Sequence, residues 1–428
     1  MDMILRDINL TTGKVGTYTV PDKVQKKYLG GRGLGGRLML DLIPKGADPL
    51  GEENVLIWLC GPLTGTLVPG CTKHAVISKS PVSGGYVDSY SSAGIGTQLV
   101  FAGYHGLIVR GKSEKPVYIY LKDKDLEIRD AGKVWGKEAY EAADIIESEI
   151  GEKGFGHALI GPAGENLVYY ACINNDYYRQ AARGGVGAVM GSKKLKAVFV
   201  RGTGGVKIAR GDDFFKFHRG KINESKNNQA AAAHKLSGTS ITMDLTLDSG
   251  MVPTKNFTYG TYQPAYGNLD SAGYAKKAKG SVACLGCPVP CGKILECKSI
   301  NNETFRLEGP EYETAGLLGT NLDISDLDLV SEANMICDKL GMDTISAGNV
   351  IGFLREATEK GLIPAEYKDQ SIEFGDKAKV LKLLDDIAVR RGIGDWAAEG
   401  VRFLANKIGK DSADFAMHSK GLEFPAYD

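Results

Sequence analysis

The stretch RGGVGAVMGSKKLKA, residues 183–197, combines a glycine-rich loop with the start of the β-rich run AVFV at 197–200. Four glycines fall within the eight residues after Arg183, and glycine allows a backbone to approach a ligand closely. A tight loop before a strand would explain the pattern in purely structural terms. The stretch lies just before the sequence changes from glycine-rich, strand-like runs to helical spacing of apolar residues. This position favours a ligand site, because such sites often lie between domains.

The residue composition and apolar spacing on the two sides of this stretch predict an α+β protein with two parts. Residues 1–207 are glycine-rich and contain short β-branched runs, which predict a β-sheet domain. Residues 208–428 show apolar residues at helical spacing, which predicts a mostly α-helical domain. The clearest predicted strands and helices are two strands within 3–20, strands in 55–61, 74–80, 106–111, 116–122, 157–164 and 196–202, and helices at 136–151, 215–236, 326–341, 344–361, 376–392 and 394–409.

Composition excludes several classes of protein. The 52 basic and 52 acidic residues balance, and a general nucleic-acid binder needs a basic surface. No run approaches the roughly 18 apolar residues of a membrane span, so we expect no transmembrane helix. The first ten residues, MDMILRDINL, are acidic where a signal peptide is basic, which predicts a cytoplasmic protein.

Two nucleotide-binding patterns are present but lack the context that their chemistry requires. GRGLGG at 31–36 satisfies G-x-G-x-x-G, yet it follows the charged, helix-like segment VPDKVQKKYL instead of a strand. GLIVRGKS at 106–113 satisfies the P-loop pattern, but Leu-Ile-Val is typical of a stiff buried strand. We therefore expect neither a Rossmann dinucleotide site nor an ATP site. A glycine turn that holds an anion in another way remains open at 31–36.

The cysteine run ACLGCPVPC at 283–291 carries the strongest chemical signal. Cys284, Cys287 and Cys291 have C-x2-C-x3-C spacing on a Gly/Pro loop, so three thiolates can converge on one inorganic centre. The spacing favours an iron–sulfur cluster over zinc, although either needs a fourth ligand. That ligand could be Cys297, Cys337 or a residue outside the chain.

Two further stretches carry carboxylates in informative places. GPEYETAG at 309–316 contains Glu313, which near a metal could act as an acid or base, although a solvated helix start explains it equally well. DKLGMDT at 338–344 joins two predicted helices, and capping by Asp338 and Asp343 is a sufficient explanation.

Together these stretches resemble the tungsten-containing aldehyde:ferredoxin oxidoreductase family over essentially the whole chain. The most specific matches are Arg183–Ala197, GPEYET, the cysteine run and the D-x-x-G-M-D stretch at Asp338. The resemblance implies a tungsten or molybdenum bis-pterin cofactor seated on the glycine-rich β domain, a [4Fe–4S] cluster, and a Mg²⁺ ion that bridges the pterin phosphates. It also implies that the first pterin motif and the cluster cysteines lie in the helical domain.

The resemblance assigns roles to individual residues. Cys284, Cys287 and Cys291 match cluster ligands, and Glu313 matches the carboxylate beside tungsten. The positions that match cofactor-binding residues are Lys73, Tyr90, Ser92, Gln180, Ala181, Ala182, Arg183, Gly184, Asp338, Met342 and Asp343. Lys73 stands where relatives commonly have Arg, and Tyr90 and Ser92 stand where relatives often have Asn and Gly.

The implied reaction is the oxidation of an aldehyde to its carboxylic acid, with water as the oxygen source and ferredoxin as the electron acceptor. Glu313 would handle protons. A homodimer or an electron-transfer subunit is a possible further partner. The alternative from a different class is a truncated, non-catalytic fragment that binds cofactor. A third hypothesis is a relative that reduces an aromatic acyl-CoA.

The resemblance also has a gap. Relatives carry a further helical domain with the fourth cluster cysteine, a second pterin motif and a histidine near tungsten, and none of these is found before Asp428. We therefore expect the C-terminal domain to be missing. Cys297 is disfavoured as a substitute ligand, because the family's fourth cysteine comes from a distant part of the chain.

Overall fold

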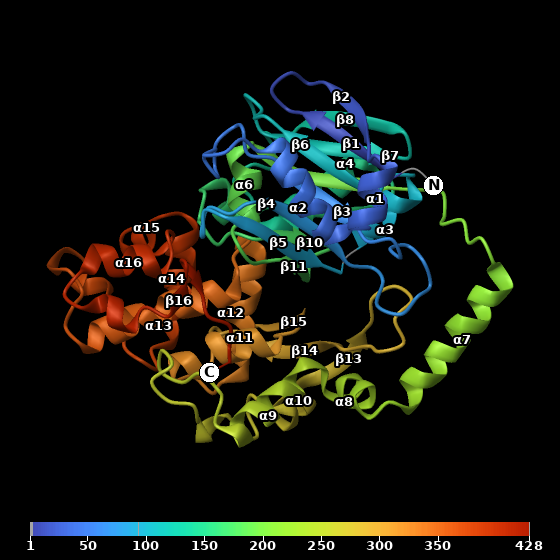
Figure 1. The fold of residues 1–428 in the computed structure, drawn as a ribbon. Coiled ribbons are helices and arrows are strands. Elements are labelled where there is room, and N and C mark those ends of the chain that lie inside the picture. The colour runs from blue at the N-terminus through green and yellow to red at the C-terminus, as the bar shows by residue number, and fades with distance from the viewer. Residues whose placement is uncertain (1–2, 93, 428) are drawn as a thin grey trace. The chain divides into compact units, whose positions relative to one another are not determined.

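The computed structural model describes residues 3–92 and 94–427 (Figure 1). The chain divides into two compact units, and each is described by itself. Unit 1 comprises the residues up to Asn223 together with Cys284–Cys287 and Lys339–Gly341. Unit 2 comprises Glu224–Ala283, Pro288–Asp338 and the residues from Met342 onward.

Unit 1 contains two six-stranded mixed sheets. The first has the order β2 (Val15–Thr19), β1 (Ile4–Asn9), β6 (Gly106–Arg110), β3 (Leu56–Cys60), β4 (His74–Lys79), β5 (Tyr86–Ser91). The second has the order β11 (Arg179–Ala181), β10 (Ile173–Asn175), β9 (Gly156–Leu159), β12 (Leu195–Arg201), β7 (Val117–Lys122), β8 (Asp125–Asp130). The helices of this unit are α1 (Asp22–Tyr28), α2 (Gly31–Leu42), α3 (Gly94–Phe101), α4 (Ala139–Ile150), α5 (Pro162–Glu165) and α6 (Val186–Ser192), with the first part of α7 (Gly211–Asn227) up to Asn223.

Apolar side chains join these layers. One core joins the two sheets and includes the fully buried Trp58 of β3 and Val198 of β12. A second core packs α2 against the outer face of the first sheet, and a third includes residues of α4 and of the second sheet. The continuously buried runs of β3 and β12 follow from burial on both faces of their sheets.

Unit 2 is mainly helical and holds one three-stranded antiparallel sheet. In that sheet β14 (Gly292–Lys298) lies between β13 (Ala278–Val282) and β15 (Thr304–Glu308). The helices are α8 (Gln229–Ser237), α9 (Ile241–Ser249), α10 (Ser271–Lys277), α11 (Tyr312–Leu317), α12 (Leu327–Leu340), α13 (Thr344–Glu359), α14 (Lys377–Ala388), α15 (Ile393–Ala397) and α16 (Val401–Ile408). Short 3₁₀ turns lie at Gly238–Ser240, Gln263–Ala265, Thr320–Leu322, Ala365–Gln370 and Ser412–Phe415, and β16 (His418–Ser419) pairs with β17 (Leu422–Glu423).

The predicted α+β class is confirmed, with glycine-rich sheets first and a helical region after them. The two nucleotide-binding patterns have the structural context that the sequence predicts. Residues 31–36 begin helix α2 and follow helix α1 instead of a strand, and residues 106–110 form strand β6. The boundary predicted at 207/208 falls between β12 and α7.

Two predicted helices are each divided in two, which corrects the sequence interpretation. The helix expected over 215–236 is interrupted at Asn228, whose side chain accepts a hydrogen bond from the Ala231 N–H and begins α8. The helix expected over 394–409 is interrupted at Gly400, which has φ +87° and separates α15 from α16. Apolar spacing persists across both interruptions, so periodicity alone does not locate them.

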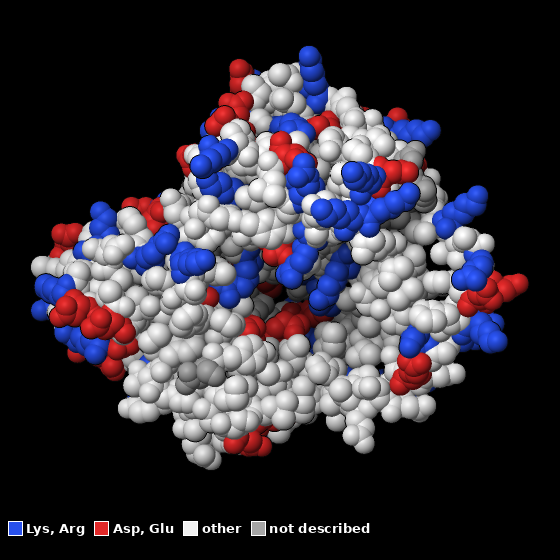
Figure 2. Space-filling model, viewed as in Figure 1, with Lys and Arg blue, Asp and Glu red and all other residues white. Residues whose placement is uncertain are grey.

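The surface agrees with the charge balance of the sequence. Lys and Arg side chains are interspersed with Asp and Glu on the face of unit 1 that Figure 2 shows. Within the described residues, no helix has the length and apolarity needed to cross a bilayer.

His74 of β4 makes the stability of unit 1 depend on pH. Its side chain is 1% exposed, and burial lowers the pKa of His74 to about 4. Between about pH 6.5 and 4 the unfolded chain binds this proton and the folded chain does not, so acidification destabilises the fold. Between pH 7 and pH 5 we expect the wild type to lose about 2 kcal/mol more stability than the His74→Gln variant. Urea unfolding at pH 7 and pH 5 measures the free energy of unfolding of both proteins. An equal change with pH in the wild type and the variant would contradict the role of His74.

Candidate functional site

The glycine-rich loop of unit 1 connects strand β11 to helix α6. Gly185 has φ +78°, and a Cβ added there would lie 2.1 Å from the Tyr169 carbonyl oxygen. The Ser80 hydroxyl donates a 2.8 Å hydrogen bond to the Gly184 carbonyl and fixes the loop from the other sheet. Glycine at 185 is therefore required by packing within the protein itself, whatever ligand the loop binds.

The residues predicted for cofactor binding occupy this loop and its neighbours. Gln180 and Ala181 lie on β11, where Gln180 pairs with Asn174, and the Cys172 thiol donates to the Gln180 Oε1 at 3.3 Å. Ala182 and Arg183 are half-buried and precede Gly184. The loop thus presents a guanidinium and an amide from one strand end.

Lys73, Tyr90 and Ser92 lie around the β4–β5 pair of the same unit. Lys73 is exposed just before β4, Tyr90 is exposed on β5, and the half-buried Ser92 follows β5. The Tyr90 hydroxyl donates to Asp88 and accepts from the Arg32 Nε at 2.8 Å, while Arg32 also pairs with Asp88 at 2.7 Å. Burial and the Asp88 carboxylate raise the pKa of Tyr90. Arg32 belongs to the GRGLGG stretch, so that stretch contributes a cation near Tyr90.

The cysteine loop has defined turns but no assembled ligand set. The Cys287 N–H donates to the Cys284 carbonyl at 2.9 Å, which closes a four-residue turn, and Gly286 within it has φ +70°. The Cys291 N–H donates to the Val289 carbonyl at 2.9 Å. Across residues 3–92 and 94–427, no group of three His, Cys, Asp or Glu side chains is placed to hold a metal ion.

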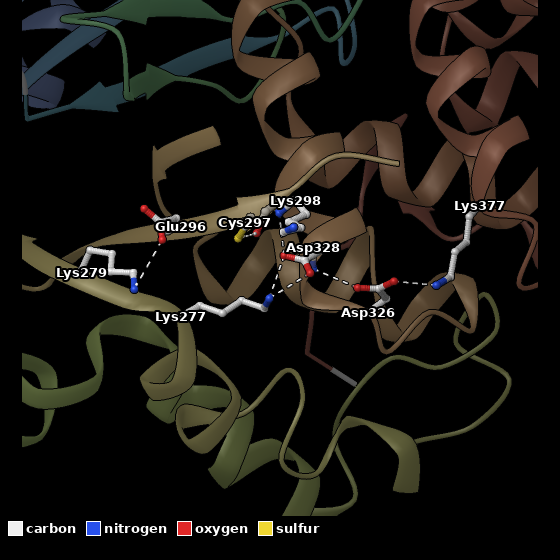
Figure 3. Close-up of polar contacts among 9 residues, drawn as sticks. Lys277, Lys279, Glu296, Cys297, Lys298, Asp326, Asp328 and Lys377 are labelled. Carbon is white, nitrogen blue, oxygen red and sulfur yellow. Dashed lines mark hydrogen bonds and ion pairs between the residues drawn. The ribbon is translucent and has the colours of Figure 1, made fainter. Parts of the chain in front are cut away.

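Cys297 lies too far along β14 to share a cluster with Cys291. The two residues are six positions apart along extended chain, or roughly 20 Å at the usual rise per residue. The Cys297 thiol is buried, donates to the Ser331 hydroxyl at 3.3 Å, and burial raises its pKa to about 11. Figure 3 shows it beside the ion pair of Lys277 with Asp328. Its surroundings favour a protonated, structural thiol.

Glu313 lies in the first turn of α11, within unit 2. Its half-buried carboxylate accepts a 2.8 Å hydrogen bond from the Ala426 N–H. The hydroxyl of the neighbouring Tyr312 donates to the Ala426 carbonyl, and the Tyr312 and Tyr427 rings lie 5.3 Å apart. The segment that ends the described chain therefore packs directly on Glu313.

Asp338, Met342 and Asp343 of the D-x-x-G-M-D stretch belong to the same unit as Glu313. Asp343 is 1% exposed and caps α13 by accepting from the N–H groups of Ile345 and Ser346. The hydroxyls of Thr314 in α11 and Thr344 in α13 are 2.8 Å apart, which links the two predicted stretches. The structure thus brings Glu313 and the Asp343 cap, 30 residues apart in sequence, into one hydrogen-bonded region.

Asp338 and Met342 of this stretch are also buried. Asp338 accepts a 2.9 Å hydrogen bond from the Asn334 side chain on α12, and Met342 is 1% exposed with its N–H bonded to the Cys337 carbonyl. In this structure these groups hold the α12–α13 junction together.

Loss of the Asp343 cap should destabilise unit 2. We expect Asp343→Ala to lower the free energy of unfolding by about 2 kcal/mol, because a buried cap is removed and helix N–H groups lose their acceptor. Asp343→Asn keeps an acceptor oxygen and should lose less than half of that. Urea denaturation followed by circular dichroism measures both variants. Equal losses in the two would show that the charge of Asp343, and not its capping bonds, is what matters.

Three further groups lie near these residues and belong to none of the sequence motifs. Glu423 accepts from the Ser346 hydroxyl at 2.8 Å, Ala426 binds Glu313 through its backbone, and Lys293 is buried two residues after Cys291. Only Lys293 left a signal in the sequence, as a lysine on a strand immediately after the cysteine run.

Comparison with known proteins identifies the family. The model described as "Aldehyde ferredoxin oxidoreductase, N-terminal domain" matches residues 5–202, and "Aldehyde ferredoxin oxidoreductase, domains 2 & 3" matches residues 216–428. A tungsten-containing aldehyde ferredoxin oxidoreductase of Pyrococcus furiosus is 42% identical over 424 residues, covering 98% of this chain and 69% of its own length. The aliphatic sulfonate oxidoreductase, WOR-like subunit, of the same organism is 34% identical, covering 99% and 70%.

One solved structure is similar to this chain over its whole length. The active-site complex BamBC of benzoyl coenzyme A reductase, in complex with 1,5-dienoyl-CoA, has a TM-score of 0.85 and 28% identity, over 100% of this chain and 67% of that one.

The expectation of a missing C-terminal domain is wrong. The match to domains 2 and 3 extends from residue 216 to residue 428. The expectation rested on three absent motifs, whereas a family match depends on the pattern of residues across the whole region and not on single ligand residues. With both family models matched across residues 5–428, the chain belongs to the aldehyde ferredoxin oxidoreductase family.

Proposed function

We propose that this oxidoreductase converts an aldehyde to the carboxylic acid at a tungsten, or molybdenum, bis-pterin centre and passes the electrons through a [4Fe–4S] cluster to ferredoxin. The observation that carries the proposal is the 42% identity, over 98% of the chain, to a tungsten-containing aldehyde ferredoxin oxidoreductase. Glu313 and the cysteine run lie within that matched region.

The donor set of the cysteine loop fits the proposed cluster. Thiols are the ligands that iron–sulfur clusters prefer, and the Cys284–Cys287 turn places two of them at the ends of one hydrogen-bonded turn. Cys284, Cys287 and Cys291 would supply three ligands. The position of Cys297 along β14 argues against it as the fourth.

The polar groups of unit 1 fit an anionic cofactor. Lys73 and Arg183 supply cations, and the Tyr90 hydroxyl is already polarised by Asp88 and Arg32. In this proposal residues 1–207 form the base for the pterin, and residues 208–428 carry the cysteines and the first pterin motif. The residues that would hold the pterins, or the Mg²⁺ between their phosphates, are Lys73, Tyr90, Ser92, Gln180, Ala181, Ala182, Arg183, Gly184, Asp338, Met342 and Asp343.

Glu313 would hold and move the proton. When bound, the metal centre and the cluster supply the two-electron and one-electron redox chemistry. The Ala426 N–H donates to one Glu313 oxygen and orients the carboxylate, which would take up and release the proton of the reaction. Burial, with a further contribution from the Glu313 charge, raises the pKa of the Tyr312 and Tyr427 phenols, so both lie near this carboxylate.

The proposed partners follow from the same reaction. Ferredoxin, or a ferredoxin-like protein, would accept single electrons. A homodimer or an electron-transfer subunit, and a cytoplasmic location, complete the proposal.

The proposal is tested by metal analysis and activity of the chain purified without oxygen. We expect about one W or Mo and about four Fe per chain, the content of one pterin centre and one cubane cluster. Aldehyde-dependent reduction of viologen dye should follow the W or Mo content. Iron without W or Mo would contradict intrinsic catalysis and favour a cofactor-binding fragment, and zinc alone would contradict the iron–sulfur assignment.

A second candidate is the reduction of an aromatic acyl-CoA. The likeness to the BamBC complex of benzoyl coenzyme A reductase favours it, with a TM-score of 0.85 at 28% identity. Oxidation of a dienoyl-CoA by the loaded protein, with no turnover of aldehydes, would support this candidate over the first. The higher identity to aldehyde-oxidising relatives makes aldehyde oxidation the stronger proposal.

A further inference from the structure

Lys293 is a buried cation next to the cysteine run. It lies on β14 and is 6% exposed. Its ammonium donates to the Lys235 carbonyl at 2.6 Å, the Ser281 hydroxyl at 2.9 Å and the Pro290 carbonyl at 3.2 Å. All three acceptors are neutral oxygens, and they fill the three donor positions of an ammonium group.

Burying an ammonium group without a counter-charge is unfavourable in free energy. Hydrogen bonds to neutral oxygens replace its water but do not neutralise it, and buried charges in proteins are normally paired. No carboxylate of the described residues forms an ion pair with Lys293.

The backbone around Lys293 holds it beside Cys291. Gly238 has φ +67°, and a Cβ added there would lie 2.6 Å from the Cys291 carbonyl oxygen and 3.2 Å from the Lys293 Cγ. The Lys293 carbonyl accepts from the Gly309 N–H at 2.8 Å, and the Lys293 ammonium itself binds Pro290, the residue before Cys291. The ammonium is therefore held from three segments of unit 2 and cannot swing to solvent without breaking them.

We propose that Lys293 is the fixed counter-charge of the Cys291 thiolate and of the anionic cluster it binds, and that it thereby sets the reduction potential of the cluster. The inference rests on the proposed function, because it requires that Cys291 bind a cluster. A nearby cation stabilises the more negative, reduced cluster, so it raises the potential. Lys293 is a positioning residue and does not touch substrate.

The test is a redox titration of the cluster signal by electron paramagnetic resonance. The full chain is reconstituted anaerobically with iron and sulfide, as wild type and as Lys293→Gln, Lys293→Arg and Lys368→Gln variants. At a fixed potential we expect Lys293→Gln to lower the ratio of reduced to oxidised cluster at least tenfold, or about 59 mV for one electron. Lys293→Arg keeps the charge and should stay within a factor of three. Lys368 is exposed and serves as the matched control.

Each outcome decides the inference. Loss of iron in Lys293→Gln but not in Lys293→Arg would also support it, because the charge alone would then hold the anionic cluster. An unshifted potential in Lys293→Gln at full iron content, or equal shifts in the Gln and Arg variants, would overturn it and leave the proposed function standing. A wild-type chain that binds no iron–sulfur cluster would overturn the proposed function, and the inference with it.

Discussion

Glu313→Gln is expected to lower kcat for aldehyde oxidation about 10²- to 10⁴-fold, the usual range for loss of a general acid or base. The amide oxygen of Gln can still accept the Ala426 N–H, so the geometry at α11 is retained. The amide cannot take up or release the proton. KM should therefore change little, and the pH dependence of kcat should lose the limb that reports this carboxyl group.

Glu311→Gln is the matched control for this variant. Glu311 is exposed two residues earlier and accepts from the Thr239 hydroxyl, whereas the Ala426 N–H donates to Glu313. Its replacement should leave kcat within about twofold, as surface substitutions generally do. Retention of kcat and of the full pH profile in Glu313→Gln would show that Glu313 is a structural residue that anchors the Ala426 segment.

Cys287→Ser is expected to remove the cluster and with it ferredoxin reduction. The serine hydroxyl is a poor ligand for iron, and the loop offers three thiols for a cluster that normally takes four ligands. Iron should fall from about four per chain towards background, and ferredoxin reduction should fall with it. Iron analysis and visible absorption of anaerobically reconstituted protein measure the loss.

Cys71→Ser separates this effect from a general sensitivity to thiol loss. Cys71 is half-buried in unit 1, outside the cysteine run, and its thiol faces the Pro69 carbonyl at 3.8 Å. The variant should keep its iron. A Cys287→Ser protein with full iron content would contradict the assignment of Cys287, whereas equal iron loss in both variants would point to misfolding.

The fold was predicted to the extent that local patterns determine it. The strands around Trp58 and Val198 were recognised because continuous apolar runs bounded by glycine are typical of buried strands. The interruptions at Asn228 and Gly400 were not predicted, because apolar spacing continues through them and only a capping side chain or a positive φ ends the helix. The expectation of a missing domain relies on absent motifs, whereas the match to domains 2 and 3 depends on the residue pattern over the whole of residues 216–428.

The resemblance to the family, the cysteine spacing and the carboxylate of Glu313 can be recognised in the sequence alone, because each is a short pattern in which residue type and spacing carry the chemistry. The groups that surround them are known only from the folded structure. Ala426 reaches Glu313 across 113 residues of chain, and Lys235 and Ser281 reach the Lys293 ammonium across 58 and 12 residues. Contacts between such distant segments depend on how helices and strands pack, and no local spacing records them.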